Sequence, residues 1–155
     1  MSVKTIITSQ YRDKVNHAAS SLHGIAIPPE GWLCTVRNAL GMSAAALARR
    51  LGKTRALVSN TEKAELDGGV TIKTMRSMAE AMNCRFVYAI VPKDSVEDIM
   101  STQAQAKAKR QVMEAGKHMA LEQQSLSQKQ IAFEIERLQH DMLKDIPANF
   151  WDDEA

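Results

Sequence analysis

Apolar residues recur every three or four positions along most of the chain, which is the spacing of one face of an α-helix. The first such stripe runs through a polar segment near the N-terminus and consists of Ile7, Tyr11, Val15, Ala18 and Leu22. The segment from Lys4 to Leu22 is therefore predicted to be one amphipathic helix. A linker from Gly24 to Pro29 follows it.

Glycines and capping residues divide the next part of the chain into short helices. Trp32, Val36 and Leu40 line the first of them, which is expected to end at Gly41. Ser43 is a suitable N-cap for a second helix, AAALARRL (44–51), which is expected to end at Gly52.

Two threonines predict where the following helices start. Thr54 is placed to cap a third helix from Arg55 to about Lys63, and the pair at 68–69 is expected to form a turn. Thr71 is placed to cap a fourth helix, whose apolar face consists of Ile72, Met75, Ala79 and Met82.

The periodicity changes at RFVYAIV (85–91), which is β-branched and aromatic and is apolar on both faces. This segment is predicted to be a short buried strand that ends before Pro92. A lone strand leaves its backbone groups unpaired, and the chain contains no second strong strand. We expect it to pair antiparallel with the same strand of a second copy, through Phe86, Val87, Tyr88 and Ile90. Pairing with the Ile25–Ile27 stretch of the same chain is the alternative.

From Asp94 to about Asp145 there is no proline and a single glycine, which predicts long helix. The stretch QAQAKAKRQ has alanine as its only apolar residue, so it is expected to bury little. A second helical stretch begins at Ser127, and its apolar stripe needs a surface to cover it, in its own core or on another protein. Together with two aromatics of the acidic tail, the stripe gives the candidate partner-binding residues Ile131, Ile135, Leu138, Met142, Phe150 and Trp151.

These patterns divide the chain into an N-terminal helix (1–27), a helix cluster with a strand (28–93) and a helical extension (94–155). The net charge of +2 is unevenly distributed among them. Residues 31–93 hold ten Lys and Arg against four Asp and Glu, whereas residues 94–155 hold seven against twelve. A basic middle favours a polyanionic partner and an acidic end favours a different one, although unevenly solvated helix surfaces also explain the asymmetry.

Several classes of protein are excluded by what the chain lacks. The longest apolar run has six residues (86–91), too short for a membrane span of about 20, and the N-terminus has no apolar secretory segment. Cys34 and Cys84 are the only cysteines, and the four histidines have no metal-ligand spacing. No phosphate-binding loop or nucleophile motif is present. We therefore expect a cytoplasmic protein with no cofactor, no metal and no catalytic activity.

The stretch from Ala44 to Lys63 has the spacing of a helix-turn-helix. A small Ala48 allows two helices to cross closely, Gly52 suits a turn with positive φ, and Val58 packs the crossing with Leu47 and Leu51. The alternative is a helical bundle that shares this geometry without binding DNA.

In a helix-turn-helix the third helix enters the major groove, and its first turn and outward face contact the bases. The candidate base contacts are Thr54, Arg55, Ala56, Ser59 and Asn60. Arg55 suits a bidentate contact with guanine, Asn60 suits adenine, and Ala56 suits a thymine methyl group. The candidate phosphate contacts are Arg49, Arg50, Lys53 and Lys63.

Residues 28–93 resemble the XRE-type core of the family named mobile mystery protein A. The shared motifs are GW before the first short helix, ALGMS, ALARRLG, VS..EKAE, VT.KT...AEA..C and the strand VYA.VPK. The resemblance implies a mainly α fold: an XRE, lambda-repressor-like helix-turn-helix bundle with one short β-strand and a long helical C-terminal extension. It also implies an antitoxin that represses its own operon and is encoded beside mobile mystery protein B, a Fic-domain protein. Fic proteins transfer AMP from ATP to hydroxyl groups of their targets.

The chain departs from many Fic antitoxins in one respect. Those proteins block ATP with a helix that carries Ser/Thr-x-x-x-Glu-Gly/Asn, and the nearest match here is Thr61 to Glu65, followed by Leu66. Because these residues close the predicted recognition helix, we interpret them as structural. The acidic region after residue 94 is then the better candidate for holding a toxin.

Three hypotheses follow. The first is a homodimeric antitoxin that binds palindromic operator DNA in its own promoter and neutralises the adjacent Fic-domain toxin. The second is a stand-alone dimeric repressor whose C-terminal helices bind a small effector or lengthen the dimer interface. The third is a protein-interaction adaptor whose helix-turn-helix no longer binds DNA, which the basic charge of residues 31–93 disfavours.

Overall fold

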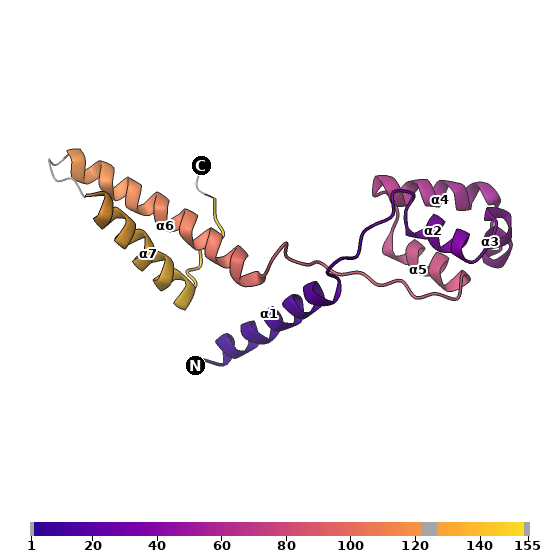
Figure 1. Ribbon diagram of the computed structural model, residues 1–155, viewed down its shortest axis with the longest axis horizontal. Coiled ribbons are helices and arrows are strands. Elements are labelled where there is room, and N and C mark those ends of the chain that lie inside the picture. Colours follow the sequence, from indigo (N-terminus) through magenta and orange to yellow (C-terminus); the bar gives the residue numbers. More distant parts are fainter. Residues whose placement is uncertain (1, 122–126, 154–155) are drawn as a thin grey trace. The chain divides into compact units, whose positions relative to one another are not determined.

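The computed structural model describes residues 2–121 and 127–153, and seven helices lie within these ranges (Figure 1). The chain divides into two compact units, one formed by residues 22–89 and the other by residues 1–21 together with 90–155. The N-terminal helix therefore shares a unit with the C-terminal extension. Our sequence-based division had assigned it a segment of its own.

Four helices build the unit of residues 22–89: α2 (Trp32–Ala39), α3 (Ala44–Leu51), α4 (Arg55–Asp67) and α5 (Ile72–Ala81). All three predicted N-caps are present. The side-chain oxygens of Ser43, Thr54 and Thr71 accept hydrogen bonds from the backbone N–H three residues later, at 3.0–3.1 Å. The third helix is four residues longer than predicted, because it continues past Lys63 as far as the turn at Gly68.

The core of this unit is formed by side chains from all four helices. Its buried members are Leu33, Leu47, Ala48, Val58, Met75, Met78 and Met82. Ala48 is 3% exposed and Val58 is fully buried, which agrees with their predicted roles at the helix crossing. Ile72 differs from the prediction, since its side chain at the start of α5 remains 46% exposed.

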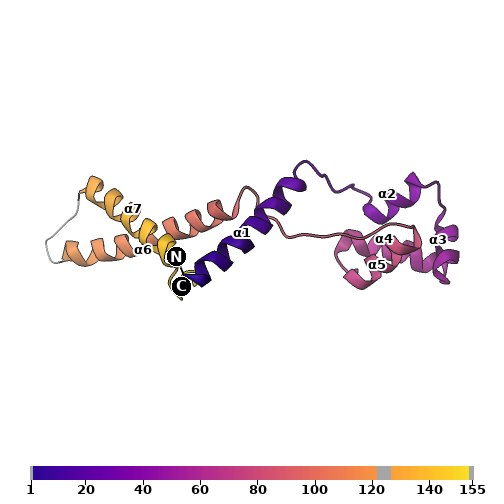
Figure 2. The same cartoon turned by 90° about the horizontal axis from the view of Figure 1, so that it is seen from below.

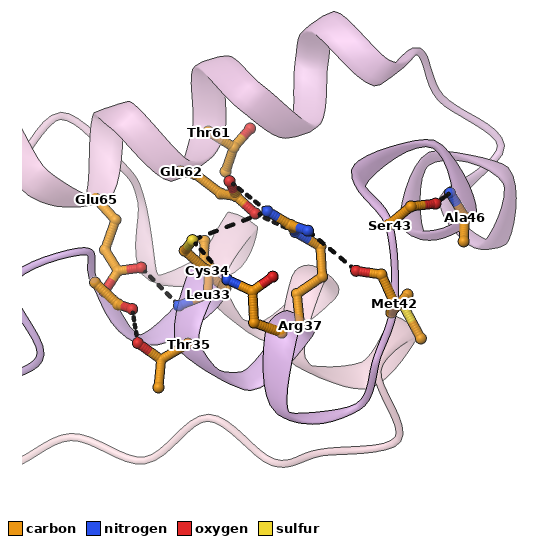
Figure 3. Close-up of polar contacts among 12 residues, drawn as sticks. Leu33, Cys34, Thr35, Arg37, Met42, Ser43, Ala46, Thr61, Glu62 and Glu65 are labelled. Atoms are coloured by element: carbon orange, nitrogen blue, oxygen red, sulfur yellow. Dashed lines mark hydrogen bonds and ion pairs between the residues drawn. The ribbon is translucent and has the colours of Figure 1, made fainter.

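Two carboxylates of α4 hold the neighbouring helix α2 (Figure 3). Glu65 accepts hydrogen bonds from the backbone N–H groups of Trp32 and Leu33, at 2.6 and 2.9 Å, and so caps α2 from another helix. Gly31 precedes α2 with a φ of 86°, and a Cβ there would lie 3.0 Å from the Glu65 carboxylate. The positive φ favours glycine at this position, and a Cβ would press against the carboxylate that caps α2.

The second carboxylate, Glu62, forms a bidentate ion pair with Arg37 of α2. The Arg37 Nε and Nη2 atoms donate to its two oxygens at 2.6 and 3.2 Å, and Arg37 Nη1 donates to the Met42 carbonyl at 3.0 Å (Figure 3). The two side chains are only 13% and 14% exposed. This bonding raises the pKa of Arg37, chiefly through the hydrogen bond to Glu62. We call Arg37, Glu62 and Glu65 the α2–α4 clamp.

The strand predicted over residues 85–91 is absent from the part of the chain that the structure describes. These residues run as an extended stretch after α5 and make no backbone hydrogen bond there (Figures 1 and 2). The physical reason is that a strand requires a partner, and a single chain supplies none. Pairing with Ile25–Ile27 does not form either. Phe86 packs on the core and stacks on Tyr88, with ring centroids 5.8 Å apart.

The other unit contains α1 (Val3–Ser21), α6 (Val96–Leu121) and α7 (Gln128–Lys144), and the last two pack together as a helical hairpin (Figures 1 and 2). Ser127 begins α7 with a reciprocal capping box, in which Gln130 accepts from the Ser127 backbone N–H at 2.9 Å. The alanine-rich part of α6 buries more than we expected. Ala104 and Ala108 are fully buried, because their small side chains allow close contact with Met142 and Phe150.

The C-terminal tail folds back onto α6. Phe150 is fully buried, and Gln103 Nε2 donates to its carbonyl oxygen at 2.8 Å. Lys107, which is 3% exposed, donates to the carbonyl oxygen of Asn149. The tail is therefore part of the core of this unit, and Trp151 at 53% exposure is its outward aromatic.

Asn16 of α1 caps the start of α6, although the two lie 80 positions apart in the sequence. Its Oδ1 accepts from the Val96 backbone N–H at 3.0 Å, and its Nδ2 donates to Glu97 at 2.8 Å. Arg12 lies 3.8 Å from the same carboxylate. These contacts explain why α1 belongs to this unit.

The ion pair of the α2–α4 clamp should contribute to the free energy of unfolding of this unit. Arg37→Met leaves the largely buried Glu62 without its cation, so the free energy of unfolding of this unit should fall by about 3 kcal/mol. The double variant Arg37→Met/Glu62→Leu should recover most of that loss, because neither charge is left unpaired. Urea unfolding followed by Trp32 fluorescence in a Trp151→Phe background measures both. An equal loss in the single and double variants would contradict the role of the ion pair.

The contact between α1 and α6 should depend on pH. Hydrogen bonds from its own backbone N–H and from Asn16 hold the pKa of Glu97 below its ordinary value of 4.5. The stabilising effect is therefore complete above that value and is lost as the pH falls through the lower, folded-state pKa. The NMR signal of the Asn16 side-chain amide should follow this titration and should stop doing so in Glu97→Gln. A wild-type signal that does not respond to acid would refute the contact.

Candidate nucleic-acid interface

The turn between α3 and α4 has the geometry that a helix-turn-helix requires. Gly52 ends α3 in the left-handed conformation, with φ 65° and ψ 31°. The backbone N–H of Lys53 donates to the Ala48 carbonyl at 2.9 Å and closes the end of the helix. Thr54 then caps α4 at once, so the two helices are joined by only three residues. The predicted positive φ of Gly52 and the predicted N-cap at Thr54 are confirmed.

The outward face of α4 carries most of the predicted base contacts. Thr54, Arg55, Ala56 and Asn60 are exposed, whereas Ser59 is half-buried. The inward face carries Val58, Glu62 and Glu65, which attach the helix to the rest of the unit. Leu57 lies between the two faces and is 39% exposed. The polar, exposed face thus belongs to a helix whose opposite face is attached to α2.

A shallow cavity of about 500 Å³ lies beside this face. Its walls combine α4 with the start of α5, and its lining includes Ala56, Asn60, Ala64, Thr71 and Thr74. Ala64, Thr71 and Thr74 were not among the candidate DNA contacts predicted from the sequence. The regular spacing of Ala56, Asn60 and Ala64, four apart, is a signal that identifies this strip of α4.

Comparison with known proteins agrees with this geometry. Residues 35–88 match the XRE-type family described as helix-turn-helix, and the match spans α3, the turn and α4. This segment is an XRE-type helix-turn-helix domain. No curated protein and no solved structure matches the chain significantly.

The four predicted phosphate contacts of the XRE-type domain are all exposed, but one of them also forms hydrogen bonds within the domain. Arg49, Lys53 and Lys63 are exposed. Arg50 is exposed as well, but its Nε donates to the Ala81 carbonyl at 2.5 Å and its Nη2 donates to Asn83 at 3.4 Å. Arg50 therefore connects α3 to the end of α5.

The segment from Thr61 to Glu65 is occupied by structural contacts. The Thr61 hydroxyl donates to the Leu57 carbonyl at 2.7 Å, and both oxygens of Glu65 bind the start of α2. This agrees with our interpretation that these residues serve the fold of the XRE-type domain.

The candidate partner-binding residues of the other unit are covered to different degrees. Met142 is 8% exposed and Phe150 is fully buried, both in the core of their own unit. Ile131, Ile135 and Leu138 are half-buried on α7, and the last two pack against that core. Trp151 is the most exposed of the six.

Among the described residues, no group of three or more His, Cys, Asp or Glu side chains is arranged to hold a metal ion. The described helices also include none that combines the length and the hydrophobicity of a membrane span.

Arg55 begins α4 and Lys53 lies in the turn before it, and we expect these two basic residues to contribute differently to DNA binding. Arg55→Ala should weaken binding to the DNA upstream of this gene by about 1–3 kcal/mol, with little change on a scrambled duplex, because only a base contact distinguishes sequences. The fold should survive, since Arg55 is exposed. Fluorescence anisotropy titrations with both duplexes measure the difference.

Lys53→Ala is the matched control for this experiment. It should weaken binding to both duplexes equally and lower the slope of log K against log salt by about 1, as expected for one lost phosphate contact. Equal losses on both duplexes for Arg55→Ala would contradict a base-reading role.

Proposed function

We propose that the protein is an antitoxin that represses its own operon by binding operator DNA as a dimer. The observation that carries the DNA-binding part is the exposed face of α4, with Arg55 and Asn60, on a helix attached from behind by the α2–α4 clamp. The side chains of such a face reach base edges in the major groove. The excess of basic residues over 31–93 supports a polyanionic partner.

Dimerisation belongs to the same proposal. Residues 85–91 have unpaired backbone groups, and Val87, Tyr88 and Ile90 are 63%, 62% and 93% exposed. Antiparallel pairing of two copies along this segment satisfies the backbone groups on the facing edge of each copy and covers part of these side chains. Two recognition helices then address half-sites about 34 Å apart on one side of a palindromic operator.

The antitoxin role rests on the resemblance of residues 28–93 to mobile mystery protein A and on the presence of a second unit. That unit has its own core and contains none of the candidate DNA contacts. We propose that it holds a Fic-domain toxin encoded by the adjacent gene, through the partly exposed side of α7 and through Trp151. Since both oxygens of Glu65 bind the start of α2, we assign this glutamate no inhibitory role toward the toxin.

A stand-alone dimeric repressor without a toxin is the second candidate. The large apolar contact between α6 and α7 favours it, because the stripe of α7 finds much of its cover inside its own unit. The absence of a Fic-type reading frame beside the gene would support this candidate. An adaptor without DNA binding would instead show no salt dependence in DNA titrations.

A growth experiment tests the antitoxin proposal. Expression of the neighbouring gene should arrest growth, and the full chain supplied in trans should relieve the arrest. A chain that ends at residue 93 should still bind DNA, because residues 22–89 have their own core, but it should not relieve the arrest. Relief by this shortened chain would place the toxin contact elsewhere, and a harmless neighbour would leave the stand-alone repressor.

A further inference from the structure

An apolar groove of about 490 Å³ lies on the XRE-type domain, away from its recognition helix. Its walls come from α2, from α5, from the linker before α2 and from residues 84–89, and no residue of α3 or α4 lines it. The floor includes the buried side chains of Leu33, Met75 and Met82. A partner bound here leaves the DNA-reading face of α4 accessible.

The rim of the groove exposes large apolar side chains. Ile25 and Ile27 are 55% and 77% exposed, Trp32 is 41% exposed, and Val87 and Tyr88 are 63% and 62% exposed. A continuous apolar surface of this kind marks an interaction site. Residues 86–89 belong both to this rim and to the segment with unpaired backbone groups, so the groove is continuous with the proposed dimer strand.

The stacking of Phe86 on Tyr88 fixes the alternation of side chains along this segment. Residues two apart point to the same side of an extended chain, so Phe86, Tyr88 and Ile90 share one side. Phe86 faces the core of its own domain. Paired residues of two antiparallel strands also point to the same side of the ribbon. The register in which Phe86 lies opposite Ile90 therefore places Ile90 of one copy on the core side of the other.

On the basis of the proposed dimer, we infer that the groove receives Ile90 of a second copy and that Tyr88 lies on the two-fold axis. Ile90 is 93% exposed in one chain, which makes it the least covered of the large apolar side chains in the described residues. In this register it lies opposite Phe86 of the partner and closes that partner's groove. Each copy thus supplies the side chain that the other copy lacks.

Ile90→Asp tests the occupant of the groove. The variant should weaken the dimer at least tenfold in sedimentation equilibrium, since burying one isoleucine contributes more than one factor of ten. Each chain should still fold, because Ile90 makes little contact within it. Leu66→Asp is the matched control: this leucine is 57% exposed, lies in the same domain and does not line the groove. The control should dimerise like the wild type.

Cysteine cross-linking tests the register in a Cys34→Ser/Cys84→Ser background. Tyr88→Cys should form a disulfide-linked dimer on mild oxidation much faster than Val87→Cys or Ala89→Cys, because only a residue on the axis faces its own copy. The dye 8-anilinonaphthalenesulfonate should bind Ile90→Asp more strongly than it binds the wild type, since the groove opens.

The outcomes separate this inference from the proposal on which it rests. A monomeric wild-type chain would overturn both. A stable dimer that is unaffected by Ile90→Asp, or that cross-links fastest through residue 87 or 89, would overturn the occupant or the register and leave dimeric repression intact. Equal dye binding by the wild-type dimer and by Ile90→Asp would show that the groove is open and suited to a small apolar ligand instead.

Discussion

The attachment of α4 to α2 by two carboxylates is the interaction on which the DNA-binding arrangement depends. Glu62 and Glu65 lie on the inner face of the helix whose outer face carries Arg55 and Asn60. One carboxylate neutralises a largely buried arginine, and the other satisfies backbone donors at a helix start, where negative charge is favoured. A recognition helix must present its side chains in a fixed orientation, and this double attachment restricts both its rotation and its shift along α2.

The two units divide the physical tasks. Residues 22–89 combine a small apolar core with a basic surface, whereas the hairpin of α6 and α7 builds its core from alanines, one methionine and one phenylalanine. Since each unit has its own core, one can change without unfolding the other. This separation is what a protein needs if it binds DNA with one part and a second macromolecule with another.

The features that were predictable from sequence are local ones. A capping residue and the helix it starts lie within four positions, so Ser43, Thr54 and Thr71 could be recognised individually. The close contact of α3 with α4 followed from the spacing of Ala48, Gly52 and Val58. Contacts between distant residues were not predictable: Glu65 caps a helix 33 positions away, and no pattern indicates its partner.

Two of the differences between expectation and structure illustrate the physical causes. The apolar segment 85–91 has the composition of a strand, but a strand is a property of two segments, and a single chain provides one. The alanines of α6 looked too small to form a core, yet their size is what lets Phe150 approach the helix closely. In both cases composition indicated the character of the surface and not what would cover it.

The most direct test of the account is a map of the DNA-binding surface. Isotope-labelled full-length protein should be titrated with a duplex from the region upstream of its gene, and the shifts of its backbone amide signals should be recorded. The account predicts that the largest shifts lie at the turn before α4 and along residues 54–63, and that α6 and α7 are unaffected. Shifts confined to α6 and α7, with α4 unchanged, would contradict it.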